Sequence, residues 1–572
     1  MTQQTPQTPF ERFAALAAPG DADTFETGVP MRDGVELAAD VYLPAPEHRP
    51  AATIVTVTPY NKDNALLTSA EARMYQREGY AFVAVDCRGR GKSEGDWAGM
   101  VNDPADTHDV IEWAAAQDWS DGSIGTTGLS YMGWVQWAAA SQRPAHLRAM
   151  VSTSAAGRWQ QEIPYTNGVL QLYFAWWVYM VRRRIDESHG LSLTDWDAVL
   201  RTLPVEDIKA FINPTGPAWD DLVGRDRLDD YWSALRFDDR YDQIDVPCLH
   251  VTGWYDLEDL LGAFHHYEHM RSDSPARDAQ RLVVGPWSHV KSRHPDSRYG
   301  DTDLGPEAAL DMDALHLRWF DHWLRGADNG IEDEPPVRVF QPGTNTWRTS
   351  QSWPLSEDTL VLHLGADGDG DGALTADPPQ GGAPELAYDY DPLDPVPTGL
   401  DVSNYPLEDV PLEQTDNESR ADVLTYTSAP LNESLVVSGW IRLELLASTD
   451  GEDTDWHVKI CDVHPDGRSF KVTQGCLRAS YRESLAEPTP LVPGRAYRFP
   501  VELWPTHHAF SPGHRVRVSV TSSDFPWFAR NLNTFGPVAH QAEPRVARNT
   551  VLHRGEDAAG GSRVVLPVER LP

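Results

Sequence analysis

Cysteine is scarce in this sequence of 572 residues, which contains four. Cys87, Cys248, Cys461 and Cys476 form no Cys-x-x-Cys pair and no His/Cys cluster with the spacing of a metal site. A disulfide scaffold or a cysteine-based zinc site is therefore not expected.

Long hydrophobic runs are also missing. The longest, VLQLYFAWWVYMV at 169–181, is shorter than the ~20 residues that a membrane-spanning helix needs, so it is interpreted as a buried or lid helix. The N-terminal segment MTQQTPQTPFERFAALAAPG has neither the basic nor the apolar region of a signal peptide. We therefore expect a cytoplasmic protein without a membrane partner.

Basic residues are few as well. Lys and Arg number 48 against 86 Asp and Glu, so the formal net charge is −38. Such a surface repels phosphate backbones, which argues against a nucleic-acid partner. Salt adaptation and codon bias both explain this composition, and neither bears on catalysis.

Two motifs resemble ligand-binding loops but lack a required residue. DCRGRGKS at 86–93 ends like a phosphate-binding loop, yet Asp86 stands where glycine is needed and its carboxylate would repel phosphate. DGDGDG at 367–372 starts like a calcium loop, yet Pro378 occupies the position of the bidentate glutamate. We expect no metal and no cofactor.

The first part of the chain alternates between strand-like and helix-like segments. Short apolar runs typical of strands occur at 31–45, 51–60, 80–89 and 147–156. Amphipathic segments typical of helices separate them at 68–79, 103–117 and 131–142. This alternation is typical of an α/β domain with a mainly parallel sheet covered by helices.

Two other regions break this rhythm. Residues 157–240 are helical and aromatic, and many short strand signals follow residue 385. Helical insertions in α/β domains usually cap the ligand-binding edge of the sheet, and many short strands suggest a jelly roll or β-sandwich. We predict a discontinuous α/β domain at 1–145 and 241–345, a helical cap at 146–240, and an all-β jelly roll at 346–572.

Three residues at predicted strand ends have the types needed for nucleophilic catalysis. Ser130 lies in GLSYMG, Asp256 closes PCLHVTGWYD and His289 closes RLVVGPWSH. A serine hydroxyl needs a neighbouring base, and that base needs an orienting carboxylate. The order Ser, Asp, His, with each residue near the carboxyl end of a strand, is that of an α/β-hydrolase.

Simpler roles remain open on this pattern alone. Ser130 and Asp256 could cap the helices that follow them, the second beginning at Leu257. His289 could be a hydrogen-bonded core histidine, with His294 as a competing base. The usual nucleophile motif also has glycine two residues after the serine, where this sequence has Met132.

Gly133, three residues after Ser130, is part of a resemblance to a known family. GLSYMG resembles the G-x-S-Y-x-G motif of the cocaine esterase and X-Pro dipeptidyl-peptidase group of serine hydrolases. GWYD, VVGPWSH and TPYNKD (58–63) resemble the aspartate, histidine and oxyanion segments of that group. PGHRVRVSVTSSDFPWFARNLNT (512–534) resembles the signature of its C-terminal jelly roll, although Phe535 stands where the group usually has glycine. The resemblance spans about residues 25 to 565.

This resemblance implies roles for five residues. Ser130, Asp256 and His289 would form the triad, and the oxyanion hole would use the Tyr60 hydroxyl and the backbone N–H of Tyr131. The implied reaction is a two-step acyl transfer through an acyl-enzyme, without a cofactor. Without the family, Tyr60 would be interpreted as a packed aromatic at a strand end.

Two acids after Asp256 bear on the choice of acyl group. Glu258 and Asp259 match the Asp-x-Glu-Asp segment of the α-amino acid ester hydrolases in the same group, whose acids bind the substrate ammonium. Glu162 is the candidate for a third acid, although the matching position falls on Ile163. The alternative is that Glu258 and Asp259 merely begin a helix, where acids are favoured.

Aromatic residues of the cap have two possible roles. Trp159 and Trp176, with Trp177 and Tyr179 nearby, could line an apolar acyl pocket. They could equally pack the cap onto the sheet, which is the commoner role of buried aromatics.

The sequence thus predicts a serine hydrolase acting on small-molecule carboxylic esters, and on amides as a further option. The first alternative is an α-amino acid ester hydrolase or an aminopeptidase of the X-Pro dipeptidyl-peptidase type. The second, from another class, is a non-catalytic carbohydrate-binding protein that uses the jelly roll. Self-association into a homo-oligomer is left open.

Overall fold

The computed structural model describes residues 23–64, 68–356, 358–366, 372–379, 385–402, 410–555 and 560–569. The segment on which the expectation of no signal peptide rests lies outside these residues, and so does most of the DGDGDG motif. Within the described residues, no helix has both the length and the hydropathy needed to cross a membrane.

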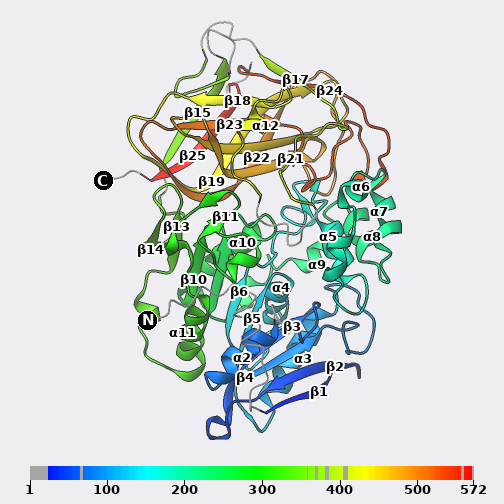
Figure 1. The fold of residues 1–572 in the computed structure, drawn as a ribbon, viewed down its shortest axis with the longest axis vertical. Helices are drawn as coiled ribbons and strands as arrows, with labels where there is room; N and C mark the ends of the chain where they lie inside the picture. Colours follow the sequence, from blue (N-terminus) through cyan, green and yellow to red (C-terminus); the bar gives the residue numbers. More distant parts are fainter. Residues whose placement is uncertain are drawn as a thin grey trace, which may run out of the picture.

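A ten-stranded sheet forms the lower part of the molecule in Figure 1. In spatial order its strands are β1 (Thr24–Pro30), β2 (Glu36–Tyr42), β4 (Ala81–Asp86), β3 (Ala51–Thr58), β5 (Ser120–Leu129), β6 (Leu147–Thr153), β9 (Cys248–Gly253), β10 (Gln280–Gly285), β13 (Val337–Gln341) and β14 (Thr346–Ser350). The strands from β4 to β13 pair in parallel, and antiparallel pairs occur only towards the two edges. The predicted, mainly parallel α/β core is confirmed.

Helices cover both faces of this sheet. Ile54 and Val55 are neighbours in β3, and they join different hydrophobic clusters because successive side chains of a strand point to opposite faces. Ile54 packs on the side of α2 (Ala70–Arg77) and α11 (Met312–Arg325). The side of Val55 carries α3 (Asp103–Ala115), α4 (Tyr131–Ala140) and α10 (Leu260–Ser272).

A mostly helical insertion separates β6 from β9. Its elements are β7 (Tyr165–Thr166), β8 (Val169–Leu170), α5 (Phe174–Val181), α6 (Trp196–Leu200), α7 (Ile208–Ile212), α8 (Ala218–Gly224) and α9 (Asp230–Leu235). All eight residues of α5 are buried, as expected for the apolar run that contains it. A short hairpin of β11 (Arg298–Tyr299) and β12 (Thr302–Asp303) follows β10.

Two predicted domain bounds need correction. The cap was placed from residue 146, but β6 pairs with β5 and β9 in the middle of the core sheet, so the insertion begins after Thr153. The core was placed up to residue 345, but β14 pairs with β13 and extends the core sheet to Ser350. In both cases, strand pairing assigns the residues to the α/β core.

The C-terminal part is built almost wholly of strands and has its own hydrophobic core. Its elements are β15 (Thr359–Ala366), β16 (Gly372–Thr375), β17 (Leu386–Tyr390), α12 (Thr415–Glu418), β18 (Leu424–Ser428), β19 (Leu435–Thr449), β20 (Asp455–Val463), β21 (Ser469–Arg478), β22 (Tyr497–Phe510), β23 (Arg515–Thr521), β24 (Ala547–Val551) and β25 (Arg563–Glu569). Among the described strands, most pairs are antiparallel, and β16 with β18 is parallel. The all-β prediction is confirmed, while the jelly-roll connectivity stays a prediction.

The C-terminal domain packs on both the insertion and the α/β core (Figure 1). Tyr173 of the insertion stacks on Trp527, with ring centroids 4.6 Å apart. Trp440 of β19 donates a hydrogen bond to Glu268 of α10, in the α/β core, at 2.8 Å. The C-terminal domain therefore contacts both other parts of the chain.

Candidate active site

Ser130 is the single residue between β5 and α4. Its backbone has φ +64° and ψ −126°, a conformation that costs a non-glycine residue about 1–3 kcal/mol. Its N–H donates to the carbonyl of Thr153 at the end of β6 at 3.0 Å. This sharp strand-to-helix turn presents the serine at the carboxyl end of the sheet and is typical of a nucleophile elbow.

The glycines around Ser130 are explained by close contacts. A Cβ on Gly128 would lie 2.4 Å from the Cβ of Met132. A Cβ on Gly133 would lie 2.9 Å from both the Cβ of Ala155 and the carbonyl of Thr153. Glycine is needed three residues after the serine because α4 passes the end of β6 at that point.

Asp256 and His289 follow the two neighbouring strands, β9 and β10. Nδ1 of His289 lies 3.1 Å from Oδ1 of Asp256 and 3.3 Å from Oδ2. Oδ1 also accepts the backbone N–H groups of Glu258 and Asp259 at 3.0 and 3.1 Å. Although burial opposes its charge, the nearby His289 keeps the pKa of Asp256 below its ordinary value.

Tyr60 lies just after β3 with its hydroxyl in the site. That hydroxyl accepts a hydrogen bond from Nε1 of Trp177 at 2.9 Å and is hydrogen-bonded to Ser130. Burial raises the pKa of Tyr60 despite these two bonds, so the hydroxyl keeps its proton and can donate it. Tyr131 begins α4, and its backbone N–H is one of those without a partner inside the helix. Its own side chain points to Asp103.

A narrow pocket of about 30 Å³ contains both Ser130 and the two acids. Its walls are Tyr60, Met100, Ser130, Tyr131, Trp134, Ala156, Trp159, Ile163, Phe174, Trp177, Glu258 and Asp259. Most of these side chains are apolar or aromatic, so the charge in the pocket comes from the two acids.

Glu258 and Asp259 are almost fully buried, at 7% and 3% exposure. Oε1 of Glu258 and Oδ1 of Asp259 are buried and accept no hydrogen bond from any described residue. Burial raises the pKa of Glu258 to about 7, and the charge of Asp256 adds to that shift. Burial also raises the pKa of Asp259, with added repulsion from its acidic neighbours. Two orphaned carboxylate oxygens in one pocket are an arrangement that a bound cation would relieve.

Two predicted substrate-binding residues do not line this pocket. Both carboxylate oxygens of Glu162 accept hydrogen bonds from backbone N–H groups. Oε2 accepts from Gly157 and Arg158 at 3.0 and 2.9 Å, and Oε1 accepts from Gly262. Trp176 is buried against Trp196, with ring centroids 5.6 Å apart. We therefore withdraw Glu162 and Trp176 as substrate contacts, whereas the predicted Trp159 does line the pocket.

Sequence reasoning missed Tyr173 and Phe174 near the acids. Phe174 lines the pocket together with Trp177, which was among the aromatic candidates. Tyr173 forms a hydrogen bond with Glu258 and stacks on Trp527 of the C-terminal domain. Within the long apolar run 169–181, no single residue stands out as a pocket residue.

Two groups in the described part of the chain have the composition of a metal site. They are Asp238, His265 and His269, and Asp462, His464 and His514. Neither group includes a residue of the pocket.

Comparisons with known proteins agree with this geometry. Residues 33–291 match the family model described as X-Pro dipeptidyl-peptidase (S15 family), and residues 329–559 match the X-Pro dipeptidyl-peptidase C-terminal non-catalytic domain. The cocaine esterase of Rhodococcus sp. (strain MB1 Bresler) is 32% identical over 94% of this chain and 97% of its own length.

Two solved structures resemble the whole chain. An α-amino acid ester hydrolase is 28% identical, with a TM-score of 0.83 and full coverage of both chains. An aminopeptidase from the marine sediment archaeon Thaumarchaeota archaeon is 26% identical, with a TM-score of 0.85, covering 100% of this chain and 98% of that one.

Proposed function

The chain belongs to the S15 family of X-Pro dipeptidyl-peptidases, and from this premise we propose that Ser130, His289 and Asp256 act as a catalytic triad on acyl groups that carry an α-ammonium. The chain is a serine hydrolase that cleaves ester bonds, and its substrates are small molecules. The alternative of a non-catalytic carbohydrate-binding protein is dropped. Both the α/β part and the C-terminal part of the chain match domains of the X-Pro dipeptidyl-peptidases, and the cocaine esterase is similar over 94% of the chain.

The proposed reaction begins with proton transfer from Ser130 to Nε2 of His289. The serine oxygen attacks the ester carbonyl, and the oxyanion accepts hydrogen bonds from the Tyr60 hydroxyl and the Tyr131 N–H. The ester C–O bond then breaks, and His289 returns the proton to the leaving alcohol. Water repeats these steps on the acyl-enzyme and releases the carboxylic acid. Asp256 holds Nδ1–H throughout, which keeps Nε2 free to accept the proton.

One observation carries the proposed acyl selection: Oε1 of Glu258 and Oδ1 of Asp259 are buried without a partner among the described residues, in the pocket that contains Ser130. A substrate ammonium supplies three donors and a positive charge. Binding it would satisfy both oxygens and relieve the repulsion between the acids. The names of the two structural relatives point to the same chemistry, because both act at an amino-bearing group.

The size of the pocket favours a small acyl group. Its volume is about 30 Å³, whereas pockets for drug-sized ligands are roughly ten times larger or more. Phe174 and Trp177 are among the large side chains that limit its size. We therefore propose an acyl group such as alanyl over one such as phenylglycyl.

Matched pairs of esters test this proposal. The first pair is alanine methyl ester and methyl propionate, which differ only in the α-ammonium, and the second is phenylglycine methyl ester and methyl phenylacetate. We expect wild type to prefer the amino ester ~100-fold in kcat/KM, about 2.7 kcal/mol, and to hydrolyse the alanine ester with a higher kcat/KM than the phenylglycine ester. The double variant Glu258→Gln/Asp259→Asn should lose that preference.

The control variant removes two negative charges at positions outside the pocket. Asp242 and Asp245 are exposed acids outside the pocket, so Asp242→Asn/Asp245→Asn should leave the preference intact. If wild type hydrolyses both members of each pair alike, the protein is an ester hydrolase without ammonium selection. If a fluorophosphonate fails to label Ser130, the proposed nucleophile is wrong. Alanine p-nitroanilide, assayed in parallel, reports any amide cleavage of the aminopeptidase kind.

A further inference from the structure

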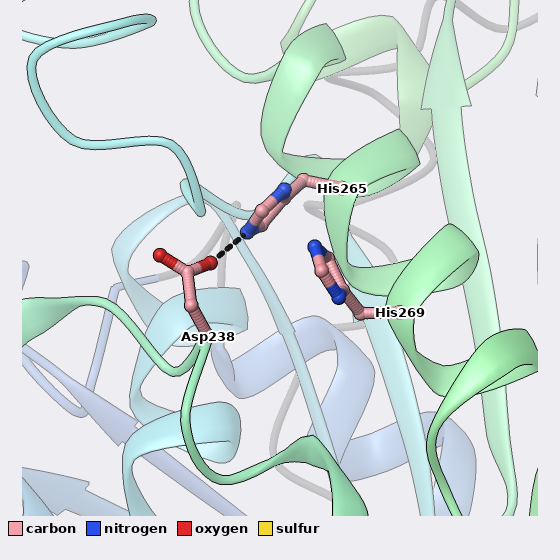
Figure 2. A group of neighbouring side chains, drawn as sticks. All are labelled: Asp238, His265 and His269. Atoms are coloured by element: carbon pink, nitrogen blue, oxygen red, sulfur yellow. Dashed lines mark hydrogen bonds and ion pairs between the residues drawn. The ribbon is translucent and has the colours of Figure 1, made fainter.

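Two histidines and one aspartate meet on the core side of the insertion, away from the pocket. His265 and His269 lie one turn apart on α10, and Asp238 lies in the segment that returns from α9 to the core. Figure 2 shows the two imidazole rings on the same side of the helix, with Asp238 reaching toward His265 from the facing loop. One ring nitrogen of each histidine and one carboxylate oxygen all lie within 4.8 Å of one another.

The helix fixes the relative position of the two rings. Residues four apart on a helix project from one face, and the ring centroids of His265 and His269 are 4.4 Å apart. Nε2 of His265 lies 2.7 Å from Oδ1 of Asp238. Ligand atoms around a tetrahedral Zn²⁺ are roughly 3.3 Å apart, given Zn–N and Zn–O bonds near 2.0 Å. The cluster needs only a small side-chain adjustment to reach that spacing.

The outer hydrogen bonds are those that metal ligands usually have. Nδ1 of His269 faces Oδ2 of Asp273 at 3.0 Å, and an Nδ1–H bond to a carboxylate leaves the lone pair on Nε2. Oδ2 of Asp238 accepts a hydrogen bond from Nε of Arg236 at 2.7 Å, which orients the carboxylate and leaves Oδ1 toward His265. The ring of His269 also stacks on Tyr241, with ring centroids 4.9 Å apart, which holds it beside His265.

We propose that Asp238, His265 and His269 bind a divalent transition-metal ion, with Zn²⁺ the best match to two imidazoles and one carboxylate. His265 stays neutral on binding, because the proton on Nε2 moves to Nδ1 and the Nε2 lone pair turns to the metal. Asp238 and His269 are partly exposed, at 41% and 35% of their side-chain surface, so an ion reaches the site from solvent. Water fills the fourth position.

The other group with metal-site composition is less suited to this role. His464 lies in the turn between β20 and β21, and His514 lies just before β23, so no single rigid element spaces the two rings. Both oxygens of Asp462 already face histidines, at 3.2 Å for His508 and 2.8 Å for His514. That arrangement is a closed hydrogen-bonded network.

The proposed metal would join two parts of the chain. Asp238 belongs to the returning end of the insertion, whereas α10 belongs to the core and starts directly after Glu258 and Asp259. A bound ion would clamp the insertion to the helix that follows the acids of the pocket. It would act as a structural clamp, independent of the hydrolase chemistry.

Zinc titration of the full-length protein tests the proposal. The protein is first dialysed against EDTA, and ZnCl₂ is then titrated at about neutral pH, where free histidine is largely unprotonated. Calorimetry gives stoichiometry and Kd, thermal unfolding gives the shift in Tm, and Co²⁺ absorption reports the coordination geometry. We expect one Zn²⁺ per chain and a higher Tm with zinc, since an ion that binds only the folded state stabilises it.

Variants locate the ion. His269→Gln and Asp238→Asn each remove one ligand from a partly exposed position and should weaken binding at least ~tenfold. The matched control is His146→Gln, because His146 pairs with Glu112 and belongs to neither group of metal-site composition. This variant should bind zinc with the same affinity as wild type. Absence of zinc binding to wild type overturns the proposal. So does loss of binding in His464→Gln with normal binding in His269→Gln.

Discussion

Oε2 of Glu258 lies 3.7 Å from Nε2 of His289, the ring nitrogen opposite the one that faces Asp256. Burial opposes a charge on this ring, but the carboxylates of Glu258 and Asp256 together hold the pKa of His289 above its ordinary value. In the proposed mechanism His289 is the general base and must be unprotonated, so activity should fall as pH drops through that raised pKa.

Of the two carboxylates, that of Glu258 lies nearer to Nε2 of His289, and Glu258→Gln removes its charge. We expect the acid limb of kcat/KM for a neutral ester such as methyl propionate to move to lower pH by about one unit or more. A pH profile of kcat/KM in wild type and variant measures this shift. Asp242→Asn, at an exposed position, should leave the limb in place. An unmoved limb in Glu258→Gln would mean that Glu258 does not set the charge of the base.

Tyr60→Phe removes the proposed oxyanion donor and keeps the ring. Loss of one such donor typically lowers kcat by about 10²–10³-fold. Trp177→Phe leaves Tyr60 in place but removes its hydrogen bond from Nε1, so the loss should be smaller, about tenfold. Steady-state kinetics on one ester give both values, with KM changing less than kcat.

Trp176 provides the matched control for these two variants. It is a buried tryptophan on the same helix as Trp177, but outside the pocket. Trp176→Phe should reduce stability without the specific loss in kcat. Equal losses of kcat in Trp176→Phe and Trp177→Phe would contradict a role for Trp177 in orienting Tyr60.

Glu71→Gln should destabilise the loop that holds His289. Glu71 accepts hydrogen bonds from Thr127 of β5 at 3.1 Å and from Arg293 at 3.3 Å. Burial opposes its charge, but Arg293 and His316 lower the pKa of Glu71 to about 2. Its stabilising effect is therefore present above the ordinary pKa of 4.5 and is lost as pH falls toward 2.

Urea unfolding at neutral pH measures the cost of this substitution. Removing one partner of a buried ion pair costs about 3 kcal/mol or more, and kcat should fall as well because Arg293 lies four residues after His289. Asp313→Asn is the comparison, because Asp313 also pairs with Arg293 but is half exposed. A cost for Glu71→Gln no greater than that for Asp313→Asn would rule out this anchoring role.

Asp103→Asn should change the pH dependence of stability. Asp103 is buried and accepts a hydrogen bond from the Tyr131 hydroxyl, and burial raises its pKa from 3.8 to about 7. Between these values the folded protein holds a proton that the unfolded chain releases. The stability from this group is present below the unfolded pKa and is lost as pH rises toward 7.

The asparagine variant lacks this titration and can still accept the Tyr131 hydrogen bond. Its stability relative to wild type should therefore improve between about pH 5 and about pH 8. Urea unfolding at the two pH values gives the difference. A constant difference would show that Asp103 has the same charge in the folded and unfolded states over this range.

The strand ends at the site could be predicted from the sequence, because each strand is a short apolar run that stops at polar or small residues. The orientation of α5 could not be predicted. All eight of its residues are apolar and buried, so no polar face shows that Phe174 and Trp177 meet the pocket while Trp176 packs on Trp196. The roles of the individual site residues stay predictions.

The start of α10 is a second feature that could not be predicted from the sequence. The sequence places a helix from Leu257, but α10 begins at Leu260, because Asp256 accepts the N–H groups of the two acids in a separate turn. That turn is why Glu258 and Asp259 are buried in the pocket. Nothing in the local residue pattern separates this turn from an ordinary helix start.

Tyr173 touches the C-terminal domain through Trp527 and the pocket through Glu258. Glu258, whose carboxylate lies 3.7 Å from Nε2 of His289, is thus supported from a domain that holds none of the proposed reacting groups. Substitutions around Trp527 can therefore alter the proposed acyl preference without any change in the proposed triad.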